Sequence, residues 1–398
     1  MRDNWQTVRL GDLCTIKGRI GFRGYTRQDL VEKGEGAITL SPSNIVDDKL
    51  NLDKCQYISW FKYDESPEIM IFEGDIIYAK TASIGKVALV KDLPEKATIN
   101  PQFVVFKNIK CNRSFLYYAV RSHGFKEQVS LITNGVAIPT VSQSNLEKLH
   151  IKLPSVSEQQ RIVDELDLLT GIIDKKNAQL RDLDALAQSI FYELFGDPIT
   201  NEKGWPIKNV GEFADVTDYV ANGSFATLRE NVSYKSEPDY AILVRLADFS
   251  NAFDRRKFVY VDKHAYDFLA KSKLFGGEII MSNVGSVGKS FICPDLGQPM
   301  SLAPNSIVIK TPNNIYSYAC FQMPSFQLAI KGITSQTALP KFNKTEFKKI
   351  KVICPPAEMQ TRYEVRWKAI QGQRERIKAS LKDAQALLDS RMDYYFND

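Results

Sequence analysis

The chain has 398 residues, of which 44% are hydrophobic and 25% charged, and its formal net charge is +5. This length is sufficient for two or three domains with hydrophobic cores. No run of about 18 apolar residues occurs, and residues 1–5 lead into polar sequence without the apolar region of a signal peptide, so we expect neither a membrane-spanning helix nor a signal peptide. The six cysteines are far apart and form no CxxC motif, so we expect buried free thiols in a reducing cytoplasm, without disulfide bonds or a zinc site.

The charge is unevenly distributed along the chain. Residues 1–154 and 199–355 contain more Lys and Arg than Asp and Glu, whereas residues 155–198 contain more acids than bases. Two basic blocks suit contact with a polyanion such as nucleic acid. An ordinary solvated surface explains the same imbalance equally well, so charge alone does not decide the function.

The first half of the sequence recurs in the second half. Trp5–Leu13 matches Trp205–Phe213, and Gly74–Lys86 (GDIIYAKTASIGK) matches Gly277–Lys289 (GEIIMSNVGSVGK). The residues that follow position 154 match those that follow position 355 at an offset of 201. This internal repetition predicts two copies of one structural unit, each a globular block followed by a long helix.

Each block combines strand and helix patterns. Strands are predicted at Ile76–Ala79, Phe103–Phe106, Ile151–Leu153, Ile279–Ser282, Ser306–Ile309 and Val352–Cys354. Helical spacing covers Ser114–Val129 and Ile315–Ile330, and short helices are predicted at Ser144–Lys148, capped by Ser144, and at Lys344–Lys348, capped by Asn343. Residues 15–51 and 217–258 differ most between the copies. In a duplicated protein, we expect such divergent segments to recognise different targets.

The first long helix is predicted between Ser157 and Phe195, and it would be roughly 58 Å long. Apolar residues recur at alternating steps of four and three, which is typical of a coiled coil, and only Lys176 interrupts the series. Gly196 and Pro198 provide a helix stop. The predicted apolar seam of this helix includes Ile162, Leu166, Leu169, Ile173, Leu180, Leu183 and Ile190.

The second long helix, Pro356–Phe396, keeps the same register. Its predicted seam includes Trp367, Ile370, Ile377, Leu381 and Leu388. We expect the two seams to pack as an antiparallel coiled coil, because each block ends where its own helix begins; a parallel pair, or pairing with another protein, is the alternative. The predicted fold class is therefore α+β, with mixed α/β blocks at 1–154 and 199–355 in internal repeat and coiled-coil helices at 155–198 and 356–398.

Signatures of covalent chemistry are incomplete. Gly285–Ser290 resembles a phosphate-binding loop, but the pattern requires glycine where Asn283 stands. Asn100–Phe103 (NPQF) resembles the motif with which adenine methyltransferases hold a flipped base, yet no glycine-rich loop for S-adenosylmethionine precedes it. The sequence contains no HExxH or GxSxG motif and no paired carboxylates at nuclease spacing. We therefore predict that the chain itself is not an enzyme.

The candidate DNA contacts are basic, hydroxyl, amide or aromatic side chains in loops of the two blocks. In the first block they are Arg19, Arg23, Tyr25, Arg27, Lys80, Ser83, Lys86 and Asn134. In the second block they are Tyr219, Asn222, Arg229, Arg255, Asn283, Ser286, Lys289 and Gln336. A structural turn or a solvated loop is the alternative for each of them.

A Gly-Asp-Ile-Ile…Ile-Gly-Lys segment in a block, followed by Glu158–Ile162 (EQQRI) at the start of a long helix, resembles the specificity (S) subunit of type I restriction-modification systems. The resemblance covers essentially the whole chain. Many members carry Arg two residues before the turn glycine, where this chain has Lys80 and Asn283. In addition, Ala82 replaces that glycine in the first copy.

The resemblance implies that each block is a target recognition domain for one half of a split site in double-stranded DNA. It implies that the paired helices set the gap between the halves and dock two methyltransferase (M) subunits, and that restriction (R) subunits can join. S-adenosylmethionine would then belong to the M subunits, and ATP and Mg²⁺ to the R subunits, with no cofactor in this chain. A self-contained DNA methyltransferase or nuclease, and a coiled-coil scaffold without DNA recognition, are the alternative hypotheses.

Overall fold

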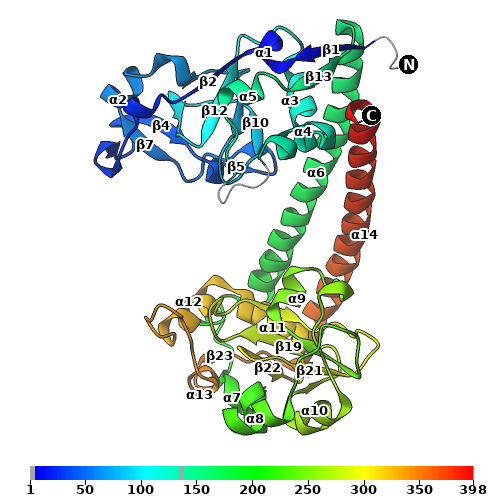
Figure 1. The fold of residues 1–398 in the computed structure, drawn as a ribbon. Helices are drawn as coiled ribbons and strands as arrows, with labels where there is room; N and C mark the ends of the chain where they lie inside the picture. Colours follow the sequence, from blue (N-terminus) through cyan, green and yellow to red (C-terminus); the bar gives the residue numbers. More distant parts are fainter. Residues whose placement is uncertain (1–4, 134–138, 398) are drawn as a thin grey trace. The chain divides into compact units, whose positions relative to one another are not determined.

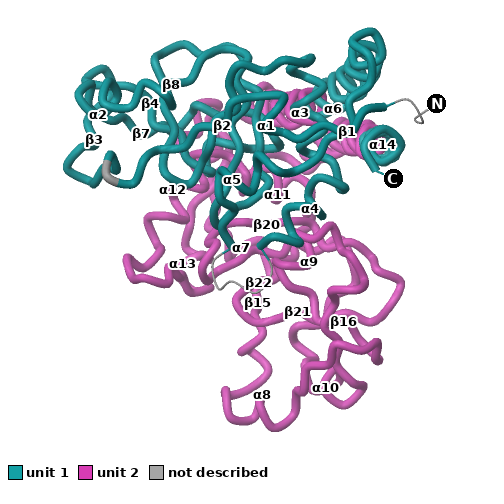
Figure 2. The backbone as a smooth tube through the Cα atoms, turned by 45° about the horizontal axis from the view of Figure 1, so that its top comes forward, with its two compact units in different colours: residues 1–177, 379–398 teal, residues 178–378 magenta. Residues whose placement is uncertain are grey.

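A computed structural model describes residues 5–133 and 139–397 (Figure 1). The contacts divide the chain into two compact units (Figure 2). Unit 1 comprises residues 1–177 and 379–398, and unit 2 comprises residues 178–378. Within the described ranges, no helix is both long enough and apolar enough to cross a membrane.

Unit 1 contains two main sheets. The first has the order β10-β9-β12-β2, in which all neighbours are antiparallel, and consists of β2 (Thr15–Gly18), β9 (Ile76–Ala79), β10 (Val87–Leu89) and β12 (Phe103–Lys107). The second has the order β3-β7-β4-β11-β8 and consists of β3 (Leu30–Val31), β4 (Gly36–Leu40), β7 (Gln56–Ser59), β8 (Met70–Ile71) and β11 (Ala97–Ile99). Strands β4 and β11 are parallel. A small pair joins β1 (Gln6–Arg9) to β13 (His150–Leu153).

Strand β9 separates two layers of the unit 1 core, because successive side chains of a strand point to opposite faces. Ile76 and Tyr78 belong to the cluster that includes Phe115 of helix α3 (Arg113–Arg121) and Phe125 of helix α4 (His123–Thr133). The intervening residue, Ile77, belongs instead to the cluster formed with the second sheet. The layers of this block are therefore helices, first sheet and second sheet.

Unit 2 repeats this topology, except that, within the described residues, its second sheet has four strands where that of unit 1 has five. Its first sheet, β15-β22-β19-β20, consists of β15 (Asp215–Asp218), β19 (Ile279–Ser282), β20 (Ser290–Ile292) and β22 (Ser306–Lys310). Its second sheet, β17-β16-β21-β18, consists of β16 (Ala241–Val244), β17 (Tyr260–Val261), β18 (Lys273–Leu274) and β21 (Met300–Leu302), with β16 and β21 parallel. The small pair is β14 (Ile207–Asn209) with β23 (Lys351–Ile353). The internal repeat is confirmed, and it extends into the segments that differ most in sequence.

The remaining short elements complete the units. In unit 1 they include α1 (Leu10–Leu13), α2 (Trp60–Asp64), α5 (Gln143–Leu146) and the hairpin β5 (Ile45–Val46) with β6 (Lys49–Leu50). In unit 2 they include α7 (Val210–Phe213), α8 (Phe225–Asn231), α9 (Leu246–Ser250), α10 (Lys263–Phe268) and α13 (Lys344–Lys348). Three of them pack on the second sheets: α2 places Tyr63 in a core cluster with Ala37 and Ile58, and α8 and α10 share a cluster with β16 and β17.

Each stretch with continuous helical spacing is in fact two helices. In the first block, Ser122 separates α3 from α4: its hydroxyl donates to the Ala119 carbonyl and accepts from the Phe125 N–H. In the second block, α11 (Asn314–Gln322) ends before α12 (Pro324–Gly332), because Pro324 has no N–H to continue the helix. The apolar spacing survives both breaks and therefore did not reveal them.

The two short helices after these pairs begin with side-chain caps. Asn343 caps α13, as predicted. The prediction of Ser144 as the cap of the other helix is wrong, because Ser142 accepts the backbone N–H and α5 begins one residue earlier than expected. Ser142 lies one residue before the helix, where a cap must lie to satisfy the first-turn N–H groups.

The two long helices, α6 (Val156–Phe195) and α14 (Ala357–Phe396), run antiparallel as predicted. In unit 1, Ile162 near the start of α6 shares a core with Tyr395 near the end of α14. In unit 2, Phe191 near the end of α6 lies 5.5 Å from Tyr363 near the start of α14, measured between ring centroids. All predicted seam residues are at least partly buried, and the fully buried ones are Ile162, Leu166, Leu169, Ile370 and Leu388.

Candidate nucleic-acid interface

The repeated glycine turn connects the two antiparallel strands β9 and β10 in unit 1, and β19 and β20 in unit 2. Gly85 and Gly288 have φ angles of 91° and 82°, which favour glycine. Gly285 has φ 77°, whereas Ala82 at the same place in the first copy has φ 62°. The first copy therefore keeps the shape of the turn although alanine is strained in this conformation.

Two neighbouring loops hold each turn. The backbone N–H of Lys80 donates to the Gln102 carbonyl (2.8 Å), and the N–H of Val141 donates to the Lys80 carbonyl (2.9 Å). Asn283 makes the two equivalent backbone bonds in the second block, both 3.1 Å long. The structure thus gathers the turn, the loop before β12 or β22, and the loop before α5 or α13 at one edge of each first sheet.

The lysine that ends each turn holds another loop. The Lys86 ammonium donates to the carbonyls of Pro42 (3.2 Å) and Ile45 (3.3 Å), and the Lys289 ammonium donates to the Ser250 hydroxyl (3.2 Å). These acceptors follow β4 and β16, the equivalent strands of the second sheets. Both lysines therefore have a structural role, which sequence analysis did not indicate, and their contact with DNA stays a prediction.

Arg19 and Tyr25 fix the loop between β2 and β3. Arg19 is only 7% exposed. Its guanidinium donates to the carbonyls of Ile99 and Arg23 and to the Thr98 hydroxyl, each at 3.3 Å, and lies 5.3 Å from the centre of the Tyr25 ring. Burial lowers the pKa of Arg19. Arg19 is therefore a loop-positioning residue in this structure and not part of the exposed basic surface.

Tyr219 and Asn222 have the same function in the second block. Tyr219 is 6% exposed, and burial raises the pKa of its hydroxyl, which accepts from the Tyr234 hydroxyl at 3.4 Å. The Asn222 amide donates to the Tyr219 carbonyl (2.9 Å) and the Ser272 hydroxyl (2.8 Å) and accepts from the Lys271 N–H (2.9 Å). Both the nitrogen and the oxygen of the Asn222 side-chain amide are thus used inside the protein.

The other predicted contacts divide by exposure. Those that are exposed are Arg27, Lys86, Arg229, Arg255, Ser286, Lys289 and Gln336. Those that are partly buried are Arg23, Lys80, Ser83 and Asn283. Arg23 lies 3.5 Å from Glu68, and Arg255 donates to the Leu296 carbonyl at 2.6 Å. Asn134 lies outside the described residues.

Lys80 and Asn283 occupy the same place in the two blocks but differ in hydrogen-bonding chemistry. The Lys80 ammonium lies beside Gly18, 3.7 Å from the position a Cβ atom would take there, and has no hydrogen-bond partner among the described residues. Burial lowers its pKa. The Asn283 amide donates weakly to the Phe342 carbonyl (3.4 Å), while its oxygen has no partner among the described residues. A lysine can only donate, whereas an asparagine can donate and accept.

Sequence analysis missed a contact between the first block and helix α6. In the β5–β6 hairpin, Asp48 pairs with Arg121 (2.8 Å) and Lys49 pairs with Asp174 of α6. The hairpin turns through Asp47 and Asp48, with φ angles of 50° and 57°. Consecutive Asp residues are compatible with such a turn, which was the available signal.

The cysteines are all free thiols. Cys14, Cys293 and Cys320 are buried, and burial raises the pKa of Cys14 to about 12. The other three are only partly buried, so the prediction of six buried thiols is wrong for half of them. Across residues 5–133 and 139–397, no group of three or more His, Cys, Asp or Glu side chains lies together as a metal site.

Comparison with known proteins identifies the family. A model of the type I restriction-modification DNA specificity domain matches residues 2–183 and again residues 201–363. The chain therefore belongs to the family of type I restriction-modification DNA specificity proteins, with one such domain in each repeat. The resemblance inferred from the Gly-Asp-Ile-Ile and Glu-Gln-Gln-Arg-Ile segments is confirmed.

Curated relatives and solved structures agree with this assignment. The putative type I restriction enzyme MjaX specificity subunit of Methanocaldococcus jannaschii is 22% identical over 383 residues, covering 92% of this chain and 87% of that protein. The MjaVIII specificity subunit of the same organism is 22% identical over 194 residues, 47% of this chain and 44% of the relative, so that match spans less than half of the relative. These relatives are named specificity subunits, in agreement with the prediction that the chain is a recognition subunit and not an enzyme.

The fold is also similar to solved structures. The type I restriction-modification S subunit from M. genitalium has a TM-score of 0.52 at 14% identity, covering 99% of this chain and 96% of that chain. A chain of a structure described as showing complex assembly and conformational transition of the type I R-M system has the same TM-score at 17% identity, covering 99% and 98%. At this identity the likeness concerns the fold alone.

Proposed function

We propose that each block recognises one half of a bipartite site in double-stranded DNA, and that α6 and α14 set the distance between the halves. The observation that carries this proposal is one framework built twice, with equivalent central strands, turns and loop-holding lysines, surrounded by loops that differ in sequence. A protein that recognised one symmetric sequence would need identical loops in both copies. Loops that differ in sequence on the same framework suit the recognition of two different half-sites.

Recognition divides between phosphate contacts and base contacts. Arg27 and Arg229, whose exposure supports this role, neutralise phosphates, which sets register and makes affinity depend on salt. Lys80 and Asn283, at equivalent sheet edges, are the proposed base contacts. A lysine suits the acceptors of guanine in the major groove, whereas an asparagine suits the donor and acceptor of adenine.

The chain acts within an assembly. We propose that methyltransferase subunits dock on the paired helices and supply S-adenosylmethionine and the catalytic residues, whereas this chain supplies only sequence recognition. Restriction subunits, with ATP and Mg²⁺, would join the same assembly. Base modification inside a duplex requires the target base to be flipped out, and we assign that step to the methyltransferase subunits.

Mapping methylated adenines genome-wide, in cells with and without this chain and with its methyltransferase partner present, tests the proposal. We expect methylation at a two-part motif with a fixed gap that vanishes when the chain is absent. Methylation that persists without the chain would contradict it. Methyl transfer by the purified chain alone, given DNA and S-adenosylmethionine, would instead support a self-contained methyltransferase.

A further inference from the structure

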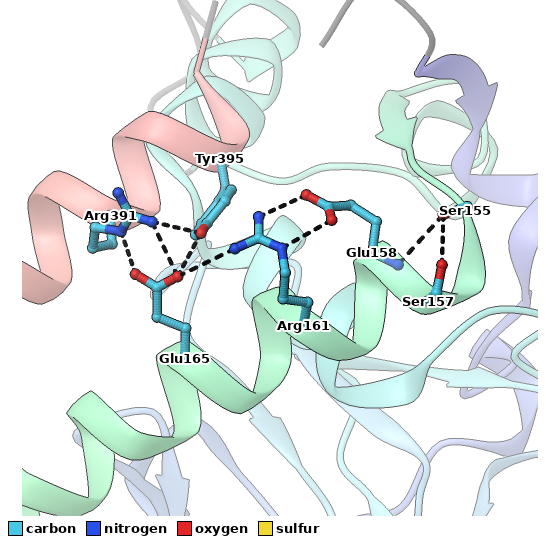
Figure 3. A network of polar contacts seen from close by, with 7 residues as sticks. All are labelled: Ser155, Ser157, Glu158, Arg161, Glu165, Arg391 and Tyr395. Carbon is cyan, nitrogen blue, oxygen red and sulfur yellow. Dashed lines mark hydrogen bonds and ion pairs between the residues drawn. The ribbon is translucent and has the colours of Figure 1, made fainter. Parts of the chain in front are cut away.

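Helices α6 and α14 share one apolar register but differ in the charged residues within and beside it. In unit 1, the Glu165 carboxylate of α6 accepts from the Arg391 guanidinium (3.0 Å) and the Tyr395 hydroxyl (2.5 Å) of α14 (Figure 3). Arg391 also donates to the Tyr395 oxygen at 2.6 Å. Within α6, Arg161 lies 3.8 Å from Glu165 and pairs with Glu158 at 2.7 Å. Glu165 is therefore the acceptor that joins the end of α14 to α6.

A second ion pair between the two helices, again with the acid on α6 and the arginine on α14, occurs in unit 2. Arg374 of α14 forms an ion pair with Asp184 of α6. The Arg374 side chain is only 18% exposed, so its charge depends on a nearby carboxylate, whereas Asp184 is 60% exposed. In both units the acid belongs to α6 and the arginine belongs to α14. Arg374 and Arg391 stand at the register positions that Ile173 and Ile190 occupy in the seam of α6, so the two seams differ at these positions.

Positions in α6 and α14 that correspond in the repeat are 201 residues apart. This offset identifies the residues that would face each other if either helix paired with its own copy in the same antiparallel register. The counterpart of Glu165 in α14 is Arg366, and the counterpart of Arg391 in α6 is Ile190. Two α14 helices would therefore place Arg391 against Arg366. Two α6 helices would place Glu165 against Ile190, with no arginine from the facing helix.

The second pair gives the same result. The counterpart of Asp184 in α14 is Gln385, and the counterpart of Arg374 in α6 is Ile173. Two α14 helices would leave Arg374 against an uncharged amide, and two α6 helices would leave Asp184 against an aliphatic side chain. Because a two-fold pair contains each contact twice, every mismatch would also occur twice.

We propose that α6 and α14 are complementary interaction surfaces that select each other and reject their own copies. The partner that fits α6 is a helix with arginines at the register positions of Arg374 and Arg391, from the same chain or from a second copy. Charged residues within or beside an apolar seam commonly determine which coiled-coil helices pair. Such selection keeps one copy of each block in every pair, and it does not depend on what the blocks bind.

The self-contacts can be reproduced inside the intact chain. Glu165→Arg gives α6 the residue type that α14 carries at this position and sets it against Arg391. We expect an approximately tenfold smaller equilibrium constant for folding in urea titrations, and recovery to within about threefold of wild type when Arg391→Glu is added. Recovery is expected because the inverted pair keeps one acid and one arginine across the helices.

Asp164→Arg is the matched control. Asp164 is the exposed neighbour of Glu165, its carboxylate accepts from Gln160 within α6, and it undergoes the same change of charge. We expect its effect to be additive with that of Arg391→Glu. If Glu165→Arg were also additive with Arg391→Glu, the charges would not select the partner and the proposal would be overturned.

Asp184→Arg with Arg374→Glu gives an independent test in unit 2. We expect each single change to weaken folding by about threefold to tenfold and the double change to recover most of that loss. If Glu165→Arg does not yield folded protein, the Asp184 and Arg374 variants still test whether the charges select the partner helix. Asp184 is largely exposed, so its replacement leaves the core intact. Failure of the double change to recover any stability would contradict the proposal.

Discussion

The contacts between α6 and α14 differ between the two ends of the helix pair. In unit 2, the end of α6 is held by fully buried aromatic rings, and Phe191 lies 5.5 Å from Tyr363 and 5.8 Å from Tyr316. In unit 1, the start of α6 holds α14 through the polar contacts of Glu165 as well as through apolar ones. The comparison indicates that hydrophobic burial determines how stably the two helices are held together at each end. The charged groups determine which helices pair.

The largest difference should appear at the aromatic end. Phe191→Ala removes a fully buried ring and should destabilise unit 2 by about 3–5 kcal/mol. Tyr395→Phe at the polar end removes one hydroxyl and should cost about 1 kcal/mol. Hydrogen exchange measured by mass spectrometry assigns each loss to its unit; equal losses at both ends would contradict the comparison.

The second largest difference concerns strands β4 and β16. A Cβ atom on Gly36 would lie 1.9 Å from the Ile58 carbonyl oxygen, whereas Tyr240 occupies the matching position before β16 and is 40% exposed. Gly36→Ala should destabilise the first block by about 3 kcal/mol, because backbone must move. Tyr240→Ala should cost less than about 1 kcal/mol. Urea unfolding with exchange mapping checks this, and a tolerated Gly36→Ala would refute it.

The third comparison tests base recognition. Lys80→Ala and Asn283→Ala should each weaken binding of the assembled complex by about tenfold, and each should relax preference in a different half-site. Arg27→Ala should weaken binding to all sequences alike. It should also reduce the slope of log binding constant against log salt concentration by about one, because one phosphate contact is lost. Competition binding with half-site variants measures both effects. Loss of preference in the same half-site for both changes would be incompatible with one half-site per block.

The fourth comparison concerns the strained turn. Ala82→Gly should stabilise the first block by about 1 kcal/mol, because Ala82 has φ 62° where the second copy has glycine. Gly285→Ala should destabilise the second block by a similar amount, since φ at Gly285 is 77°. Thermal unfolding of both variants provides the measurement, and a destabilising Ala82→Gly would show that the alanine methyl group packs usefully.

The smallest effect is a pH dependence at the polar end. The hydrogen bond from Arg391 lowers the pKa of Glu165 from its ordinary value of 4.5. The folded state therefore gains stability from the ionised carboxylate above about pH 4.5, and loses it as the pH falls through the lowered value. Solvent screening limits this to less than about 1 kcal/mol. Glu165→Gln should flatten the stability profile between about pH 5 and pH 3; an unchanged slope would exclude Glu165 as its source.

The periodic parts of the molecule were predictable from sequence. Heptad spacing indicated both long helices and their seam residues, such as Ile162 in α6 and Leu388 in α14. The repeated Gly-Asp-Ile-Ile segment indicated matching strands. Both predictions were possible because side-chain periodicity follows backbone geometry directly. The helix break at Ser122 and the cap at Ser142 were missed, since a serine hydroxyl can serve either a helix or a turn.

The candidate interface was only partly predictable. Sequence analysis chose Arg19 as a DNA contact because arginine in a glycine-rich loop suits phosphate, but its three partners come from residues about 80 positions away as well as from the loop itself. Such long-range hydrogen bonds leave no local pattern. The loop-holding bonds of Lys86 and Lys289 were hidden for the same reason, whereas Arg27 and Arg229 are exposed and remain available for the predicted contacts.

The central claim, that each block recognises its own half-site, is tested most directly by exchanging residues 15–51 for the same segment of another family member. Methylated-adenine mapping with the partner subunits present then reports the new motif. The account predicts that one half of the motif changes while the other half and the gap stay the same. A motif that is unchanged, or that changes in both halves, would contradict it.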